Sequence, residues 1–381
     1  MMKARLRLLC FMLLLCVTIS AQAQGDETVP VSSGMTTGLM AVLSVTPDTP
    51  ETRANLEYVD YAAARNVAFA VNPDAAQDEM TMIRALPGFS PFTRVGLENF
   101  ALFPQVNGFA FEDIHRAAYF GQPPADGAIF LGNFDADAID AALTARGFMA
   151  SSLFGFDGWC SAEGCDQGTR ANIRGIVEGE AFDNGLGRKP PILLNVTDLF
   201  FARDLTTLEA MAAAQSGSGE TLGAAADVQA MLRAIQMAAP ETAGIRAAML
   251  FNVEAVTGPN ADEKLSLPTA LLFIDWGDAS GQTAAVVLAY DSAEQAQQTG
   301  EYVIAQMGTA VSAANGQPIQ SLFEAAGATI GEPIVASEGG AAAVLIPLSY
   351  GLPEAGDYPY RLYYLLISMA AQRDLGWLAG S

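Results

Sequence analysis

Histidine is almost absent from this chain of 381 residues, in which His115 is the only one. A Ser-His-Asp triad would have to use that residue, and the G-x-S-x-G elbow of the α/β-hydrolases does not occur. The segment 111–116 around His115 has apolar residues at helical spacing. We therefore expect a histidine on the surface of a helix and not a general base.

Phosphate-binding motifs are missing as well, since no G-x-x-x-x-G-K occurs. Gly217, Gly219 and Gly223 approach the spacing of a dinucleotide-binding loop but miss it by one residue. They also lie between two expected helices instead of after a strand. These glycines indicate a flexible loop, and we expect no cofactor.

Basic residues are scarce. The chain has 19 Lys and Arg against 42 Asp and Glu, which gives a net charge of −23 at pH 7. Binding to nucleic acid requires Lys and Arg side chains that displace counterions from phosphates. So acidic a chain repels nucleic acid and anionic lipid, and neither is an expected partner.

Long apolar runs are confined to the N-terminus. Basic residues within the first seven positions precede an apolar stretch over 8–19, and the small residues at 21–23 form a cleavage site. This is the pattern of a secretory signal peptide over residues 1–23. Later apolar runs are far shorter than the ~20 residues that a spanning helix needs. We expect a secreted, periplasmic or envelope-associated protein with no transmembrane segment in the mature chain.

Two alternatives to simple cleavage stay open at this point. Cys16 follows an apolar run as a lipidated cysteine would, but Leu15 stands where a small residue is usual. A retained N-terminal anchor is the other alternative, although the apolar stretch is short for a span. The polar segment 24–38, rich in Ser, Thr and Gly, is expected to be a flexible tether.

Only two cysteines follow the expected signal peptide, Cys160 and Cys165. In an oxidising compartment, two cysteines so close in the sequence predict a disulfide that closes a short loop. A zinc site is less favoured, because two thiolates do not complete a tetrahedral shell. The spacing is also not the C-x-x-C of a redox motif.

Carboxylates are abundant around this loop. Asp157, Glu163 and Asp166 offer oxygen ligands on a Gly-containing backbone, which makes them candidates for a calcium site. The simpler interpretation is a solvated acidic loop, and we expect no other metal site. Asp135 is expected to cap a helix, since the run 133–137 is not followed by the glycine of an EF-hand turn.

The order of the expected elements predicts an α+β protein of two lobes, over residues 39–215 and 216–381. Strands arrive in hairpins as well as across capped helices. Each lobe is therefore expected to hold a mixed or antiparallel sheet with helices packed mainly on one face. In the first lobe the main expected elements are a buried strand over 39–45, a helix over 58–64, a strand over 128–131, a helix after Asp135, a hairpin that pairs 153–159 with 172–177, a strand over 192–196 and a helix that starts at the capping box 206–209.

The second lobe is expected to end in a docked helix. Leu362, Leu365, Leu366 and Met369 recur at i, i+3, i+4 and i+7 over 360–369, which makes one apolar stripe. The other expected elements are a helix over 228–235, strands over 245–256, 269–276 and 283–290, a long helix over 293–307, and a hairpin over 333–348.

No motif assigns a reaction to this chain. Export, two lobes and the lack of a catalytic motif favour a non-catalytic protein that binds an unknown protein or small-molecule ligand in the cell envelope or exterior. The alternative is an extracytoplasmic hydrolase that uses carboxylates in a cleft between the lobes. A carboxylate pair in one pocket would favour the hydrolase, and an exposed apolar patch would favour the binding protein. A structural or surface-layer role is a third reading.

Overall fold

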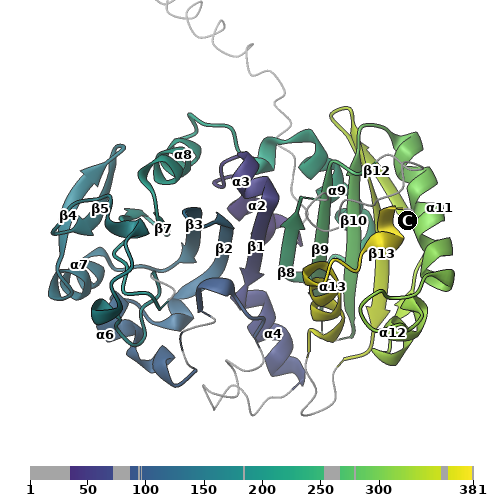
Figure 1. Ribbon diagram of the computed structural model, residues 1–381, viewed down its shortest axis with the longest axis horizontal. Coiled ribbons are helices and arrows are strands. Elements are labelled where there is room, and N and C mark those ends of the chain that lie inside the picture. The colour runs from purple at the N-terminus through teal and green to yellow at the C-terminus, as the bar shows by residue number, and fades with distance from the viewer. Residues whose placement is uncertain are drawn as a thin grey trace, which may run out of the picture. The chain divides into compact units, whose positions relative to one another are not determined.

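In the described part of the chain, strands from both expected lobes form one antiparallel sheet of 13 strands (Figure 1). The computed structural model describes residues 35–71, 86–92, 95, 97–182, 185–252, 267–278, 280–352 and 359–379. The expected signal peptide and residues 24–34 of the expected tether lie outside these residues.

The elements alternate between strands and helices along the whole chain. The strands are β1 (Asn55–Asp60), β2 (Ile114–Gln122), β3 (Ala125–Gly132), β4 (Phe148–Leu153), β5 (Phe156–Ser161), β6 (Ile192–Asn195), β7 (Asp198–Ala202), β8 (Gly244–Phe251), β9 (Ala270–Gly277), β10 (Gln282–Tyr290), β11 (Thr329–Ile330), β12 (Ile334–Glu338) and β13 (Ala341–Tyr350). The helices are α2 (Thr37–Leu43), α3 (Pro50–Ala54), α4 (Tyr61–Val71), α6 (Phe103–Asn107), α7 (Ala136–Ala145), α8 (Leu205–Gln215), α9 (Ala226–Ala238), α11 (Ala293–Thr309), α12 (Ile319–Ala325), α13 (Arg361–Ala371) and α14 (Gly376–Ala379).

The sheet is continuous across the expected lobe boundary. Its strand order is β11-β13-β10-β9-β8-β1-β2-β3-β7-β6-β5-β4, and β12 also pairs with β13. β1 lies inside this sheet, with β2 on one side and β8 on the other. The mixed helix and strand content and the antiparallel pairing agree with the sequence. The two-lobe arrangement is not confirmed, because strands from 39–215 and from 216–381 share this sheet.

Helices cover both faces of the sheet, which corrects the expectation of one helical face. On one face α2, α8 and α9 bury apolar side chains against the strands. On the other face α6 and α7 cover the N-terminal half, and α11, α12, α13 and α14 cover the C-terminal half. The strands are apolar on both sides, as β10 illustrates: Ala285 and Val287 face α9, whereas Ala284 and Val286 face the opposite layer.

Helix α2 corrects the expected strand over 39–45. Short apolar runs fit a buried strand and a buried helix equally well by periodicity. Here the helix buries Leu39 and the residues one turn later against the sheet. Met35 and Thr36, which belong to the expected tether, are buried too. Packed structure therefore begins before the expected boundary at Leu39.

The expected helix over 58–64 is divided between β1 and α4. Asp60, the last residue of β1, accepts the Ala63 N–H with Oδ1 at 2.8 Å, so α4 begins directly after it. Asp60 Oδ2 also accepts Arg116 Nε at 2.8 Å. Gly38 of α2 packs on this pair, since a Cβ there would lie 2.7 Å from both side chains.

Two further expectations are corrected nearby. The segment 172–177 is not a strand: it contains a turn of 3₁₀ helix over Ile173–Gly175, and β5 pairs instead with β4 and β6. Helix α8 is capped by Asp204 and not by Thr206. Asp204 Oδ1 accepts the Thr207 N–H at 2.9 Å, which satisfies one of the free N–H groups of the first turn.

Other expectations are confirmed. Asp135 caps α7 and Ser292 caps α11. Helix α13 covers nearly all of 360–369 and buries Leu362 and Leu366 in the core. β8 ends at Phe251, and the remainder of the expected strand over 245–256 lies largely outside the described residues. None of the helices that the structure describes is long and apolar enough to cross a bilayer.

Candidate functional site

His115 lies on strand β2, which corrects the expected helix. The strand is irregular here, because its register with β3 shifts between Ile114 and Arg116. His115 is half-buried, and its Nε2 lies 3.3 Å from the side-chain amide of Asn133. Within the described residues the ring has no hydrogen bond to a serine or a carboxylate, and its expected lack of a catalytic role stays a prediction.

The three calcium candidates are all exposed. Asp157 lies near the start of β5, while Glu163 and Asp166 follow its other end. Since a strand rises about 3.3 Å per residue, β5 separates Asp157 from the other two carboxylates. Asp166 accepts Gln167 Nε2 at 2.7 Å and lies 3.9 Å from Arg170. No group of three or more His, Cys, Asp or Glu that could hold a metal occurs among the residues that the structure describes.

Cys160 and Cys165 form the expected disulfide, with their Cα atoms 4.7 Å apart. Cys160 is buried near the end of β5, and Cys165 is half-buried in the following loop. The bond fixes this loop against the sheet. Such a disulfide is compatible with an extracytoplasmic protein.

A fully buried ion pair joins Arg246 of β8 to Asp275 of β9. Arg246 Nε donates to Asp275 Oδ1 at 2.7 Å, and the Tyr350 hydroxyl donates to Oδ2 at 2.8 Å. Arg246 also donates to Gln282 Oε1 at 2.8 Å and lies 4.9 Å from the ring centre of Tyr360, which precedes α13. Burial raises the pKa of Asp275, and Arg246 opposes that rise. The network ties β8, β9, β10 and β13 together.

Glu57 of β1 is a buried carboxyl group of a different kind, since it forms no ion pair with any residue that the structure describes. It is 8% exposed, and its Oε2 accepts the Ser90 backbone N–H at 3.0 Å. Burial raises the pKa of Glu57 to about 7, against the lowering effect of the Ser90 hydrogen bonds. Tyr364 of α13 accepts the Gly88 N–H at 2.5 Å, so β1 and α13 both hold the segment 86–92.

The other buried carboxylates in the described residues have structural partners. Each meets an arginine or the start of a turn, which compensates the cost of burying its charge. These groups are Asp60 with Arg116, Asp126 with Arg203, Glu180 with Arg146, and Asp374 with the Ser312 hydroxyl and the Ala313 N–H.

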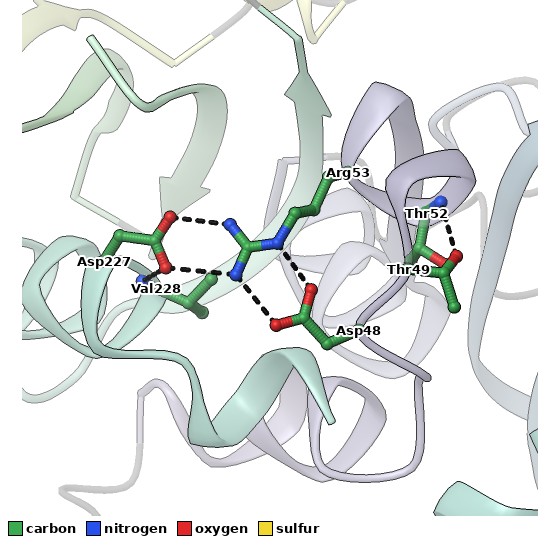
Figure 2. A network of polar contacts seen from close by, with 6 residues as sticks. All are labelled: Asp48, Thr49, Thr52, Arg53, Asp227 and Val228. Carbon is green, nitrogen blue, oxygen red and sulfur yellow. Dashed lines mark hydrogen bonds and ion pairs between the residues drawn. The ribbon is translucent and has the colours of Figure 1, made fainter. Parts of the chain in front are cut away.

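The half-buried Arg53 neutralises two carboxylates near the N-terminus of α9. Figure 2 shows the Arg53 guanidinium between the carboxylates of Asp48 and Asp227. Its Nε lies 2.5 Å from Asp48 Oδ1, and its Nη1 lies 2.7 Å from Asp227 Oδ2. The hydrogen bond to Asp48 is the largest influence that raises the pKa of Arg53. The cluster joins α3 to α9.

An apolar cavity lies on the face covered by α2 and α9. Its volume is about 20 Å³, and its walls are Leu, Val and Met side chains, among them Leu39, Leu56 and Met231. Ligand pockets are typically roughly 300–1,000 Å³. This cavity has room for about one small group, and it is a packing gap and not a ligand site.

Two hairpin turns at one end of the sheet each carry an exposed apolar residue with a left-handed backbone. Phe154 and Gly155 link β4 to β5 and take φ values of 55° and 88°, and Val196 links β6 to β7 with φ 47°. Phe154 is 41% exposed and Val196 is 85% exposed. Both turns lie at the same end of the sheet, because β5 and β6 pair with Asp157 opposite Leu194. We call Phe154 and Val196 the tip residues.

The backbone of the tip residues is strained. A left-handed conformation costs a residue with a Cβ roughly 1–2 kcal/mol, and hairpin turns normally place Asn, Asp or Gly there. Arg373, another such residue, ends helix α13, where the Asp374 N–H bonds to the Met369 carbonyl at 2.8 Å. The tip residues have no comparable capping role, and they present apolar side chains to solvent.

Sequence reasoning missed Glu57 and the tip residues. The alternation in Asn55–Asp60 is a strand signal, but it predicts that Glu57 faces solvent. In the structure α13 and the segment 86–92 cover that face. The signal for the first turn was Gly155 between two short apolar runs. Nothing in the sequence marks Val196 as a turn residue, because valine is typical of strands.

Comparison with known proteins gives no family. No protein-family model matches the chain, and no curated protein matches it. Two solved structures align with it, crystal form IV and crystal form I of TP0453, each at 10% identity and a TM-score of 0.31. The alignments cover 86% of this chain and 99% or 97% of those chains. A TM-score this low establishes neither a shared fold nor a shared function.

Proposed function

We propose that this chain is an exported, non-catalytic protein that binds another protein of the cell envelope or exterior through the end of the sheet that carries the tip residues. The observation that carries the proposal is the strain and exposure of Phe154 and Val196. Backbone strain and exposed apolar side chains both lower the stability of the free protein. Features of this kind mark interaction sites, where a partner covers the apolar surface.

The buried charges support this proposal. Arg246, Arg203 and Arg146 each neutralise a carboxylate within the sheet or between the sheet and its covering segments. These groups stabilise the fold and are not accessible to a substrate. The exposed disulfide loop and the acidic surface fit an exported protein.

A labelled surface cysteine tests the proposal. Thr197→Cys, at the exposed residue that follows Val196, and the control Met237→Cys, at an exposed residue of α9, each carry a benzophenone maleimide. The label reaches only the introduced cysteine, because the native Cys160 and Cys165 are bonded to each other. On illumination with an envelope extract of the producing cells, we expect a discrete adduct at position 197 and none at 237. Unlabelled parent protein should abolish the adduct, and unlabelled Phe154→Asn/Val196→Gly protein should not. Equal adducts at both positions, or equal competition by both proteins, would refute the proposal.

The hydrolase remains a second candidate because of Glu57. A carboxyl group with a pKa near 7 is suited to general acid catalysis. The parent protein would then hydrolyse some member of a panel of p-nitrophenyl esters and glycosides, and Glu57→Gln would lose that activity while remaining folded. Activity that Glu57→Gln retains, or none in the parent, counts against this candidate.

A further inference from the structure

We infer that β4 accepts an extended strand of a second protein, which adds to the sheet as a further antiparallel strand next to the tip residues. This inference rests on the proposed function and names the kind of partner: a polypeptide segment with basic side chains and an apolar face. β4 is the last strand of the sheet order and pairs with β5 alone among the described strands (Figure 1, left).

Along the outer side of β4, every second residue directs its backbone N–H and C=O away from the sheet. The Ala162 N–H donates to the Gly147 carbonyl at 3.1 Å, and the register continues in steps of two from that pair through Met149 and Ser151. These residues direct their backbone groups toward β5. The groups of Ala150 and Ser152 therefore point away from the sheet. A second strand would form hydrogen bonds with these outward groups, as β5 does with the backbone groups of Met149 and Ser151.

The sequence of β4 lacks the features that usually protect a strand edge. Phe148–Leu153 contains no charged residue and no proline, and its register with β5 has no bulge. Met149 is exposed on the face that also holds Leu153. Exposed apolar side chains therefore occur both on the edge strand, at Met149, and in its turn, at Phe154.

The opposite end of the same sheet shows the usual protection. The outer side of β13 is covered by two short strands, β12 with five residues and β11 with two. Glu332 and Pro333 lie between them, and β12 ends at Glu338. Charge, proline and shortness all discourage strand addition there. β4 has neither the charged residues nor the proline of this edge, and with six residues it is longer than both covering strands.

The negative charge of this chain favours a basic partner. A second copy of this chain would also carry a net charge of −23, so that two copies repel each other. Asp157, an exposed carboxylate on β5, lies directly opposite Ser152 of the edge strand. A basic side chain placed opposite Ser152 on the added strand would lie on the same face as this carboxylate, two strands or about 10 Å away, close enough for attraction but not for a direct ion pair. A cationic strand of a different protein is therefore favoured over self-association.

Two labelled peptides provide the probe. Each has the length of β4, six residues; one alternates Lys with Val and the other alternates Glu with Val. The valines favour an extended backbone. We expect the Lys peptide to bind the purified protein, by fluorescence anisotropy, at least about tenfold more tightly than the Glu peptide. A Lys peptide with N-methyl groups on alternate residues, in both possible phases, should lose about tenfold in affinity in one phase only.

Protein variants complete the test. Ala150→Pro removes an outward N–H without removing a bond to β5, whereas the control Ala150→Val keeps that N–H. We expect about tenfold weaker binding of the Lys peptide to Ala150→Pro and unchanged binding to Ala150→Val. Equal binding of both peptides, equal effects of both methylation phases, or equal affinity of both variants would overturn strand addition. A benzophenone adduct at position 197 combined with any of these results would leave the proposed function intact and remove only this inference.

Discussion

Replacing Glu57 by Gln should make the protein more stable at pH 8 and leave it nearly unchanged at pH 4. Glutamine has the same size, and its carbonyl oxygen can still accept the Ser90 N–H that Glu57 accepts at 3.0 Å. The substitution therefore removes a buried negative charge and little else.

The magnitude follows from the raised pKa of Glu57, about 7 in the folded chain against an ordinary 4.5. The folded state binds the Glu57 proton more tightly than the unfolded state does. The stability that this proton contributes is therefore fully present below pH 4.5 and is lost as the pH rises through 7. A difference of 2.5 units corresponds to about 3 kcal/mol at 1.36 kcal/mol per unit. We expect Glu57→Gln to avoid most of this loss.

Urea unfolding between pH 4 and pH 8 measures this effect. The relevant quantity is the difference in unfolding free energy between the variant and the parent at each pH, because the other buried carboxylates contribute equally to both proteins. Glu241→Gln, which removes an exposed carboxylate, serves as the control. Parallel curves for the parent and Glu57→Gln across this range would refute the reasoning.

Three further predictions concern stability. Val196→Gly should raise the unfolding free energy by about 1 kcal/mol, because glycine relieves the left-handed strain. The control Val311→Gly, at an exposed valine without positive φ, should lower the unfolding free energy by roughly 0.5–1 kcal/mol. Equal effects of the two substitutions on urea unfolding would show that Val196 is unstrained. Arg246→Met should cost about 3–5 kcal/mol by leaving Asp275 buried without its partner, and Arg246→Met/Asp275→Leu should recover part of that loss; thermal unfolding of the two variants at the same temperature would contradict this. Leu366→Ala should cost about 2–5 kcal/mol, since Leu366 is fully buried in α13, and an unchanged urea midpoint would mean that α13 is not part of the core.

Local chemistry made several elements of this fold predictable. Asp135 and Ser292 cap their helices as their residue types predict, and Cys160 and Cys165 are too close in the sequence to leave much choice of partner. The apolar stripe that includes Leu362 and Leu366 predicted α13, because its spacing of three and four residues fits a helix and not a strand.

Long-range pairing was not predictable in the same way. Leu56 of β1 lies opposite Leu250 of β8, and this contact joins the two expected lobes into one sheet. Strands that are apolar on both faces give no sequence signal for which neighbour they take. Glu57 was missed for a related reason, since its burial depends on segment 86–92 and on α13, far away in the chain.

The tip residues depend on turn geometry that propensity opposes. Phenylalanine and valine favour strands, so neither Phe154 nor Val196 reads as a turn residue. Their left-handed backbone is visible only in the structure. A conflict of this kind between local preference and observed conformation occurs at strained sites as well as at functional ones.

Hydrogen exchange of single β4 amides in the presence of the Lys peptide tests the central claim most directly. The Ala150 and Ser152 amides point away from β5 and should exchange rapidly in the free protein, whereas the Ser151 amide is already bonded to β5. The account predicts that saturating peptide slows exchange at Ala150 and Ser152 by about tenfold or more and leaves Ser151 unchanged. Protection that is absent from both residues, or spread evenly over β4 and the helices, would contradict it.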